Sequence, residues 1–108
     1  MSQISQADIV VVGFARTAIG SFGGALKDVP NAQLATTAVR AALQRSGADP
    51  AAVGHVVMGT VIPTEPRDAY LGRIAALDAG CPKETCGAAC GSGRASDFAG
   101  VFIVTGCR

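Results

Sequence analysis

The sequence has no tryptophan, one tyrosine, four phenylalanines and one histidine among its 108 residues. A buried core must therefore be built from alanine, valine, isoleucine and leucine, without large aromatic anchors. Nine basic and eight acidic residues are dispersed along the chain and give a net charge of +1, so there is no basic stripe for a phosphate backbone. These absences exclude a nucleic acid as the expected partner.

Long apolar runs are also missing. The apolar run near the start is only "IVVV", and no positively charged region precedes it, so we expect neither a secretion signal nor a membrane span. The chain is expected to be cytoplasmic. In that reducing compartment, its four cysteines are expected to be free thiols, metal ligands or a catalytic group rather than disulfides.

The order of apolar and turn-forming stretches predicts one α/β domain. We predict a buried central strand over 8–15, a surface loop over 16–30, a helix over 31–46, a second strand over 54–62 and a second helix over 67–80. Asp49 and Pro50 predict a short turn before the second strand. Strands that alternate with helices favour a parallel sheet in a layered fold.

The first helix is the clearest element. Asn31 is its expected N-cap and Gly47 its expected end. Its predicted buried stripe is Leu34, Ala35, Ala38, Val39, Ala42 and Leu43, and that of the second helix is Leu71, Ile74, Ala75 and Asp78.

Several phrases occur in the order and spacing of one known family. They are "ARTAIGSFGGALKDVP" at 15–30, "VVMGTVIPTEPRDAYLGRIAALDAG" at 56–80, "PKET" at 82–85 and "CGSG" at 90–93. Together they resemble the N-terminus of the thiolases, and most of all the bacterial β-ketothiolases of the acetyl-CoA acetyltransferase type. The resemblance implies a partial thiolase N-terminal domain over 1–108, with a thiolase-like layered α/β fold.

The same resemblance implies a reaction. Cys90 matches the family's acyl-accepting nucleophile, which takes an acyl group from one acyl-CoA and passes it to CoA or to acetyl-CoA. A thiolate suits a reversible carrier, because one thioester replaces another. Gly91 and Gly93 would let the backbone turn sharply into a helix. The implied substrates are CoA thioesters, without a resident cofactor or metal, and the intact relative is expected to form a homo-oligomer, a dimer or tetramer, with no membrane partner.

The remaining cysteines and the histidine match no functional position of the family. We interpret Cys81 and Cys86 as structural, and Cys107 lacks the Cys-x-Gly context of the family's second cysteine. His55 is interpreted as a residue at the start of a strand. Arg16 and Lys27 are expected to be surface or inter-subunit charges, and the glycines of "GSFGG" to form a turn rather than a phosphate loop.

The sequence departs from the family after residue 85. Only "CGAA" separates "PKET" from Cys90, where the family has a longer strand-forming segment, so the position of this cysteine could be shifted. Two alternatives stay open. One is a non-catalytic thiolase-like fragment. The other is a metal-binding module that uses Cys81, Cys86, Cys90 and Cys107, although their spacing has no paired C-x2-C knuckles.

Overall fold

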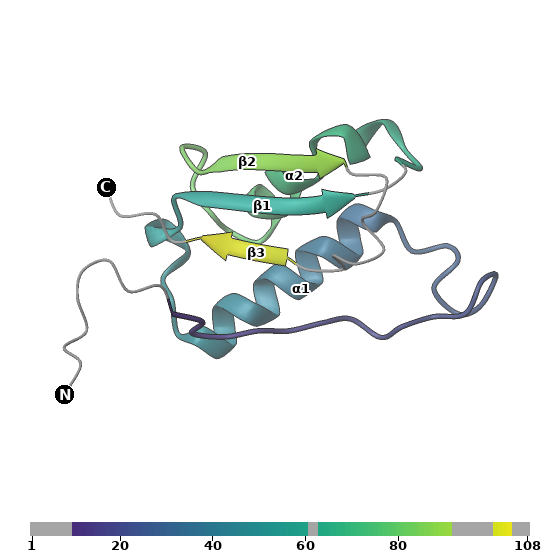
Figure 1. Ribbon diagram of the computed structural model, residues 1–108, viewed down its shortest axis with the longest axis horizontal. Helices are drawn as coiled ribbons and strands as arrows, with labels where there is room; N and C mark the ends of the chain where they lie inside the picture. Colours follow the sequence, from purple (N-terminus) through teal and green to yellow (C-terminus); the bar gives the residue numbers. More distant parts are fainter. Residues whose placement is uncertain (1–9, 61–62, 92–100, 105–108) are drawn as a thin grey trace.

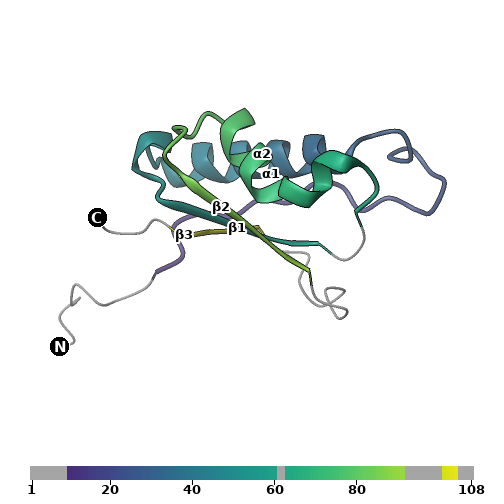
Figure 2. The same cartoon turned by 90° about the horizontal axis from the view of Figure 1, so that it is seen from above.

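A three-stranded sheet with two helices on one face forms the fold (Figures 1 and 2). The computed structural model describes residues 10–60, 63–91 and 101–104, of which 88–91 and 101–104 are described by their backbone only. The elements are α1 (Asn31–Ser46), η1 (Pro50–Ala52), β1 (His55–Thr60), η2 (Pro66–Tyr70), α2 (Leu71–Asp78), β2 (Cys86–Gly91) and β3 (Val101–Val104). Within these parts of the chain, no helix has the length and apolar character that a bilayer span needs.

Helix α1 confirms the prediction for 31–46, but its first turn differs. Pro30 is the N-cap, and Asn31 is instead the first helical residue, with its side chain turned to the loop that precedes η2. Gly47 ends the helix in the left-handed region, at φ 68°, where glycine has no Cβ to clash. The buried stripe contains Val39 and Leu43 as predicted; its other members are Ala32 and Thr36, whereas the other predicted positions are half-buried.

The second helix has two parts, the 3₁₀ helix η2 and the α-helix α2. Leu71 and Ala75 are buried as predicted, but the stripe continues through Gly72 and Ala76, whereas Asp78 is exposed. Because α2 contacts both α1 and the sheet, it needs two apolar faces, and small residues let both neighbours approach. The turn at Asp49 is also confirmed, since its carboxylate accepts a hydrogen bond of 3.0 Å from the Ala51 amide.

A parallel pair is present, as predicted, but the partner of β1 is β2 and not the strand predicted over 8–15; His55 lies opposite Cys86 and Thr60 opposite Gly91. β1 lies within the predicted 54–62, of which 61–62 lie outside the described residues. The short "CGAACG" stretch was not predicted as a strand. It forms the ladder with β1, and α2 packs directly on its backbone: a Cβ built at Gly87 would lie 2.5 Å from the Arg73 Cα.

The prediction of a central strand over 8–15 is wrong for the part that the structure describes, residues 10–15, which form no strand. Val11 is 85% exposed and Phe14 80% exposed. These residues cannot pair with the central strand β1, because both of its edges are occupied, one by β2 and the other by the antiparallel β3. Residues 10–15 instead pass along the end of α1, where Arg45 Nη1 donates to the Phe14 carbonyl at 3.2 Å. The surface loop predicted for 16–30 is confirmed, with turns and a left-handed Gly23 at φ 68°.

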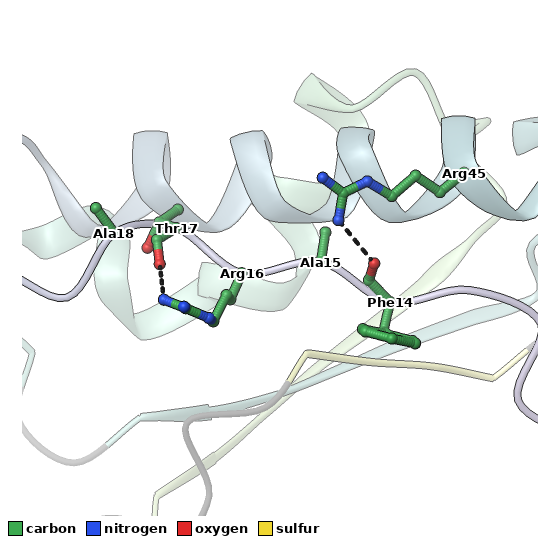
Figure 3. A pocket seen from close by; sticks show the side chains of 6 residues that line it. All are labelled: Phe14, Ala15, Arg16, Thr17, Ala18 and Arg45. Atoms are coloured by element: carbon green, nitrogen blue, oxygen red, sulfur yellow. Dashed lines mark hydrogen bonds between the residues drawn. The ribbon is translucent and has the colours of Figure 1, made fainter.

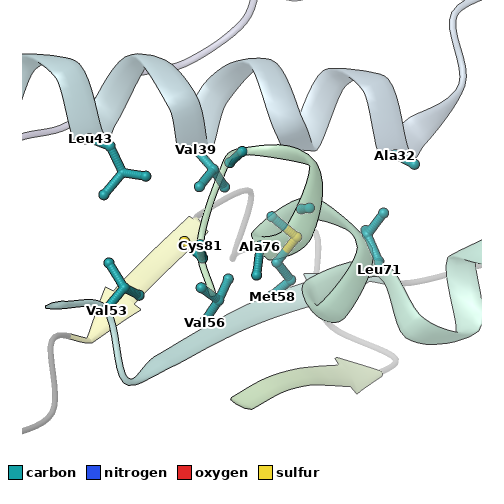
Figure 4. Packing of buried hydrophobic residues seen from close by; sticks show 11 residues of the cluster. Ala32, Val39, Leu43, Val53, Val56, Met58, Leu71, Ala76 and Cys81 are labelled. Carbon is teal, nitrogen blue, oxygen red and sulfur yellow. The ribbon is translucent and has the colours of Figure 1, made fainter. Parts of the chain in front are cut away.

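The core lies between the helices and the sheet and contains no aromatic residue among those described (Figure 4). Val39 and Leu43 of α1 point toward Val56 of β1 and the residues next to it. The cluster consists of Ala32, Val39, Leu43, Val53, Val56, Met58, Leu71, Ala75, Ala76, Ala79 and Cys81. The aliphatic interior expected from the composition is therefore confirmed, with one methionine and one cysteine added.

Candidate functional site

Cys90 is the next-to-last residue of β2 and pairs with Gly59, near the carboxyl end of the parallel pair. In α/β sheets this end is where ligands and reactive groups gather. Its side chain and residues 92–93 of the CGSG motif lie outside the described residues, as does the predicted helix start. Gly91 is the last residue of the strand. The backbone thus places Cys90 near the carboxyl ends of the parallel strands, where the active sites of α/β proteins typically lie.

His55, the one histidine of the sequence, lies at the opposite end of β1 and is exposed. It begins the strand, as predicted, and pairs with Cys86 rather than with Cys90. It lies four positions from Gly59, which is about 13 Å along an extended strand. His55 is therefore too distant to act as the base for a thiol at position 90.

Cys81 and Cys86 have opposite environments. Cys81 is 6% exposed within the core, and this burial raises the pKa of its thiol, because burial disfavours the charged thiolate. Cys86 is exposed. In the described residues, no group of three or more histidine, cysteine or acidic side chains could hold a metal ion, but the Cys90 side chain and Cys107 lie outside those residues.

A buried carboxylate, which the sequence reasoning missed, fixes the loop after β1. Asp68 is 1% exposed, and its Oδ2 accepts hydrogen bonds from the amide and the hydroxyl of Thr64 at 2.7 and 2.8 Å. The Glu65 amide and Asn31 Nδ2 donate to the same oxygen, each at 3.1 Å. These bonds, the Thr64 amide first, lower the pKa of Asp68.

The hydrogen bonds of this carboxylate connect the start of α1 to the loop that follows β1. This loop lies at the carboxyl end of the parallel strands, as Cys90 does (Figure 1). Its other oxygen, Oδ1, has no hydrogen-bond partner in the described structure. The spacing of Glu65 and Asp68 is the signal that sequence reasoning could have used, since the two form a capping box around η2.

An open groove of about 470 Å³ lies between α1 and residues 14–18 (Figure 3). Arg45 lines it from α1, and Arg16 lines it from the extended segment and donates to the Thr17 carbonyl at 3.4 Å. Arg16 and Lys27 are both exposed, as predicted for surface charges. The groove includes neither Cys90 nor the Asp68 network.

Comparisons with known proteins agree with this fold. A family model described as "Thiolase, N-terminal domain" matches residues 9–105. Beta-ketothiolase BktB of Cupriavidus necator is 53% identical over 90 residues, which cover 80% of this chain and 23% of that protein. An acetyl-CoA acetyltransferase of the same organism is 41% identical, with the same two shares covered.

Solved structures give the same result. The crystal structure of human mitochondrial 3-ketoacyl-CoA thiolase in complex with CoA superposes with a TM-score of 0.73 at 37% identity, over 75% of this chain and 21% of that chain. The acetyl-CoA acetyltransferase from Syntrophomonas wolfei gives 0.68 at 30% identity, over 83% and 24%. The chain therefore belongs to the thiolase family. It spans about a quarter of the length of the curated relatives that it matches.

Proposed function

We propose that this chain is the N-terminal part of an acyl-CoA C-acyltransferase that condenses or cleaves acyl-CoA reversibly through an acyl-cysteine at Cys90. Membership of the thiolase family supports the reaction class. The observation that carries the assignment to Cys90 is the position of the CGSG motif, which begins at the carboxyl end of a parallel strand pair. The names of the relatives, β-ketothiolase and acetyl-CoA acetyltransferase, indicate the same chemistry in those proteins.

The reaction has two halves. In the first, the Cys90 thiolate attacks the carbonyl carbon of an acyl-CoA, the bond from that carbon to the CoA sulfur breaks, and the departing thiolate takes up a proton. In the second, either CoA or the α-carbon of acetyl-CoA attacks the acyl-cysteine and releases Cys90. CoA thioesters are thus substrates, and the proposal needs no metal and no resident cofactor.

Both halves need a base and hydrogen-bond donors for the carbonyl oxygen that becomes negatively charged. His55 is about 13 Å along the strands from the level of Cys90, so it does not supply the base. We propose that the 108-residue chain alone does not turn over, and that a longer polypeptide provides these groups. Assembly of that polypeptide as a dimer or tetramer and its cytoplasmic location belong to the same proposal.

The test is thiolysis of acetoacetyl-CoA, which is measured as the loss of its absorbance after CoA is added. In a full-length thiolase polypeptide that carries this segment, Cys90→Ser should abolish turnover. The matched control is Cys81→Ala, which changes a cysteine of the core and should leave turnover within a few-fold. Full activity of the Cys90→Ser variant would refute the assignment of the nucleophile.

A non-catalytic thiolase-like fragment is the second candidate. The observation in its favour is that Cys90 lies inside β2, in a segment shorter than the family's strand, with no imidazole beside it. If a full-length polypeptide with this segment shows no thiolysis and no acyl-enzyme at Cys90, this second candidate replaces the first.

A further inference from the structure

One arginine of α2 holds the turn from which β2 begins. Arg73 Nη1 donates to the Thr85 carbonyl at 2.5 Å, and Arg73 Nη2 donates to the Lys83 carbonyl at 2.7 Å. Both carbonyls lie in the turn that leads directly into β2. Because the two nitrogens belong to one planar guanidinium, the pair of bonds fixes the direction of the turn as well as its distance from the helix.

The backbone of the same arginine also meets the strand. A Cβ built at Gly87 would lie 2.5 Å from both the Cα and the amide nitrogen of Arg73, so α2 rests on β2 with no side chain between them. Figure 2 shows α2 on the side of the sheet that carries both helices. Arg73 therefore holds the chain from residue 83 to residue 87.

The same turn is also joined to the segment that precedes β1. Thr85 is 2% exposed, and its hydroxyl donates to the Val53 carbonyl at 2.8 Å. The Cys86 amide donates to the Gly54 carbonyl at 2.9 Å. The parallel ladder thus begins at an end of β2 that is fixed both to α2 and to the chain before β1.

The residues of β2 themselves do little to set its register against β1. The strand "CGAACG" has two glycines, two alanines and no β-branched residue. Register is weakly specified in glycine-rich strands, because few large side chains alternate between the two faces. Cys90 follows the turn in one unbroken strand, so the position of the turn decides how far along β1 it lies. A slip of one position would move it by about 3.3 Å and turn it to the opposite face of the sheet.

We propose that Arg73 is a positioning residue for Cys90: its guanidinium fixes the turn over 83–85 and so sets the register that places Cys90 opposite Gly59. Arg73 acts through the backbone of β2 and not by contact with a substrate. The use of this position in acyl transfer rests on the proposed function, whereas the register does not. Displacement of a reacting group by about 1 Å can lower the rate about 100-fold, because the attack needs the two atoms close and aligned.

The first measurement is the register itself, in the 108-residue chain. Arg73→Met removes both hydrogen bonds and keeps an unbranched apolar side chain. In nuclear magnetic resonance spectra, cross-strand proton contacts should pair Gly59 with Cys90 in the wild type, and with a neighbouring position in part or all of Arg73→Met. Arg40→Met is the matched control, because Arg40 also donates to a backbone carbonyl, that of Asp78 at 2.6 Å, but not to the turn before β2. It should keep the wild-type register.

The second measurement is thiolysis in a full-length polypeptide that carries this segment. Arg73→Met should lower kcat, expressed per folded molecule, about 100-fold and leave KM for CoA within about twofold, because the nucleophile is displaced and the substrate contacts remain. Arg40→Met should leave both unchanged. Arg73→Lys keeps the charge but not the planar fork, so its kcat should lie between those of the wild type and Arg73→Met.

The wild-type register in Arg73→Met would overturn the proposal, and so would a kcat equal to that of Arg40→Met. Circular dichroism gives the folded fraction of each variant. If Arg73→Met does not fold, Arg73→Lys decides: a shifted register in part of the molecules supports the proposal, and the wild-type register alone overturns it. Failure of the proposed function is a separate result, because full activity of Cys90→Ser would remove the nucleophile and leave the register of β2 as measured.

Discussion

Two valine-rich stretches of this chain have opposite fates. Val56, in β1, is completely buried, whereas Val11, in the "VVVGF" stretch over 10–14, is 85% exposed. Both stretches have the β-branched composition of a buried strand. The difference is that β1 has partners on both edges and two helices over one face, whereas none of the described strands lies beside residues 10–14. An apolar, β-branched sequence therefore favours a buried strand, but the strand forms only where the rest of the fold leaves an unpaired strand beside it.

The opposite case is β2. Its sequence, "CGAACG", has no β-branched residue, yet it forms the full parallel ladder with β1. Gly87 lets the backbone of α2 approach closely, and Arg73 of α2 donates to the Thr85 and Lys83 carbonyls just before the strand. For β2, packing against α2 and pairing with a free edge of β1 therefore matter more than the low β-strand propensity of its residues.

The largest change in the free energy of unfolding is expected for Asp68→Ala. It removes the acceptor of four hydrogen bonds, and of their donors only Asn31 Nδ2 keeps another acceptor, Thr64 Oγ1, so the free energy of unfolding should fall by about 3 kcal/mol. The measurement is the midpoint of urea unfolding. Asp78→Ala is the matched control, because this half-exposed carboxylate makes only a surface ion pair of 3.6 Å with Arg67 and should matter by less than about 0.5 kcal/mol. Equal losses for the two variants would contradict the role of the network.

Gly87→Ala tests whether close approach is what makes β2 a strand. The added methyl group would meet backbone atoms of Arg73 at 2.5 Å, so the helix must move, at a cost of about 1–3 kcal/mol. Cys86→Ala, one position earlier and exposed, should change stability by less than about 0.5 kcal/mol. If Gly87→Ala is as harmless as Cys86→Ala, α2 does not rest on the β2 backbone, and another cause for the strand is needed.

A smaller effect concerns acid. The pKa of Asp68 is lowered in the folded chain from its ordinary value of 3.8, mainly by the Thr64 hydrogen bonds. A carboxyl group with a depressed folded pKa stabilises the fold above its unfolded pKa, and this contribution is lost as pH falls through the folded value. The urea concentration at the midpoint of wild-type unfolding should therefore decrease as the pH is lowered below about 4, and that of Asp68→Asn should decrease less steeply. Parallel curves would show that other carboxyl groups cause the acid sensitivity.

Residues 31–80 could be predicted because their signals are local. The helix over 31–46 ends at Gly47, and the apolar run in β1 lies between turn signals, so periodicity and termination agree. The fold of the rest depends on pairing between distant segments. No local pattern shows that the short run "VFIV" occupies an edge of β1, and this occupancy excludes residues 10–15, the described part of the strand predicted over 8–15, from that edge.

For the candidate site, the sequence could supply residue types but not neighbours. Cys90 was singled out by its motif, and its role stays a prediction. The pairing of His55 with Cys86 is a consequence of strand register, which the sequence between them does not specify. Asp68 was missed although three of its four hydrogen bonds are local and its spacing from Glu65 is that of a capping box; only the bond from Asn31, 37 residues earlier, depends on the fold.

The smallest expected effect tests the opening comparison directly. Val11→Ala should change the free energy of unfolding by less than about 0.5 kcal/mol, because this exposed side chain gains little on folding. Val56→Ala should cost about 2 kcal/mol, since two buried methyl groups and their contacts are lost. The same samples allow hydrogen exchange, in which the amides of residues 10–14 should exchange much faster than those of β1. If Val11→Ala costs as much as Val56→Ala and its amide is protected, then residues 10–14 are paired in solution. They would have taken an edge of the sheet from another strand, and β3, the shortest of the three, is the one whose loss of protection should be measured next.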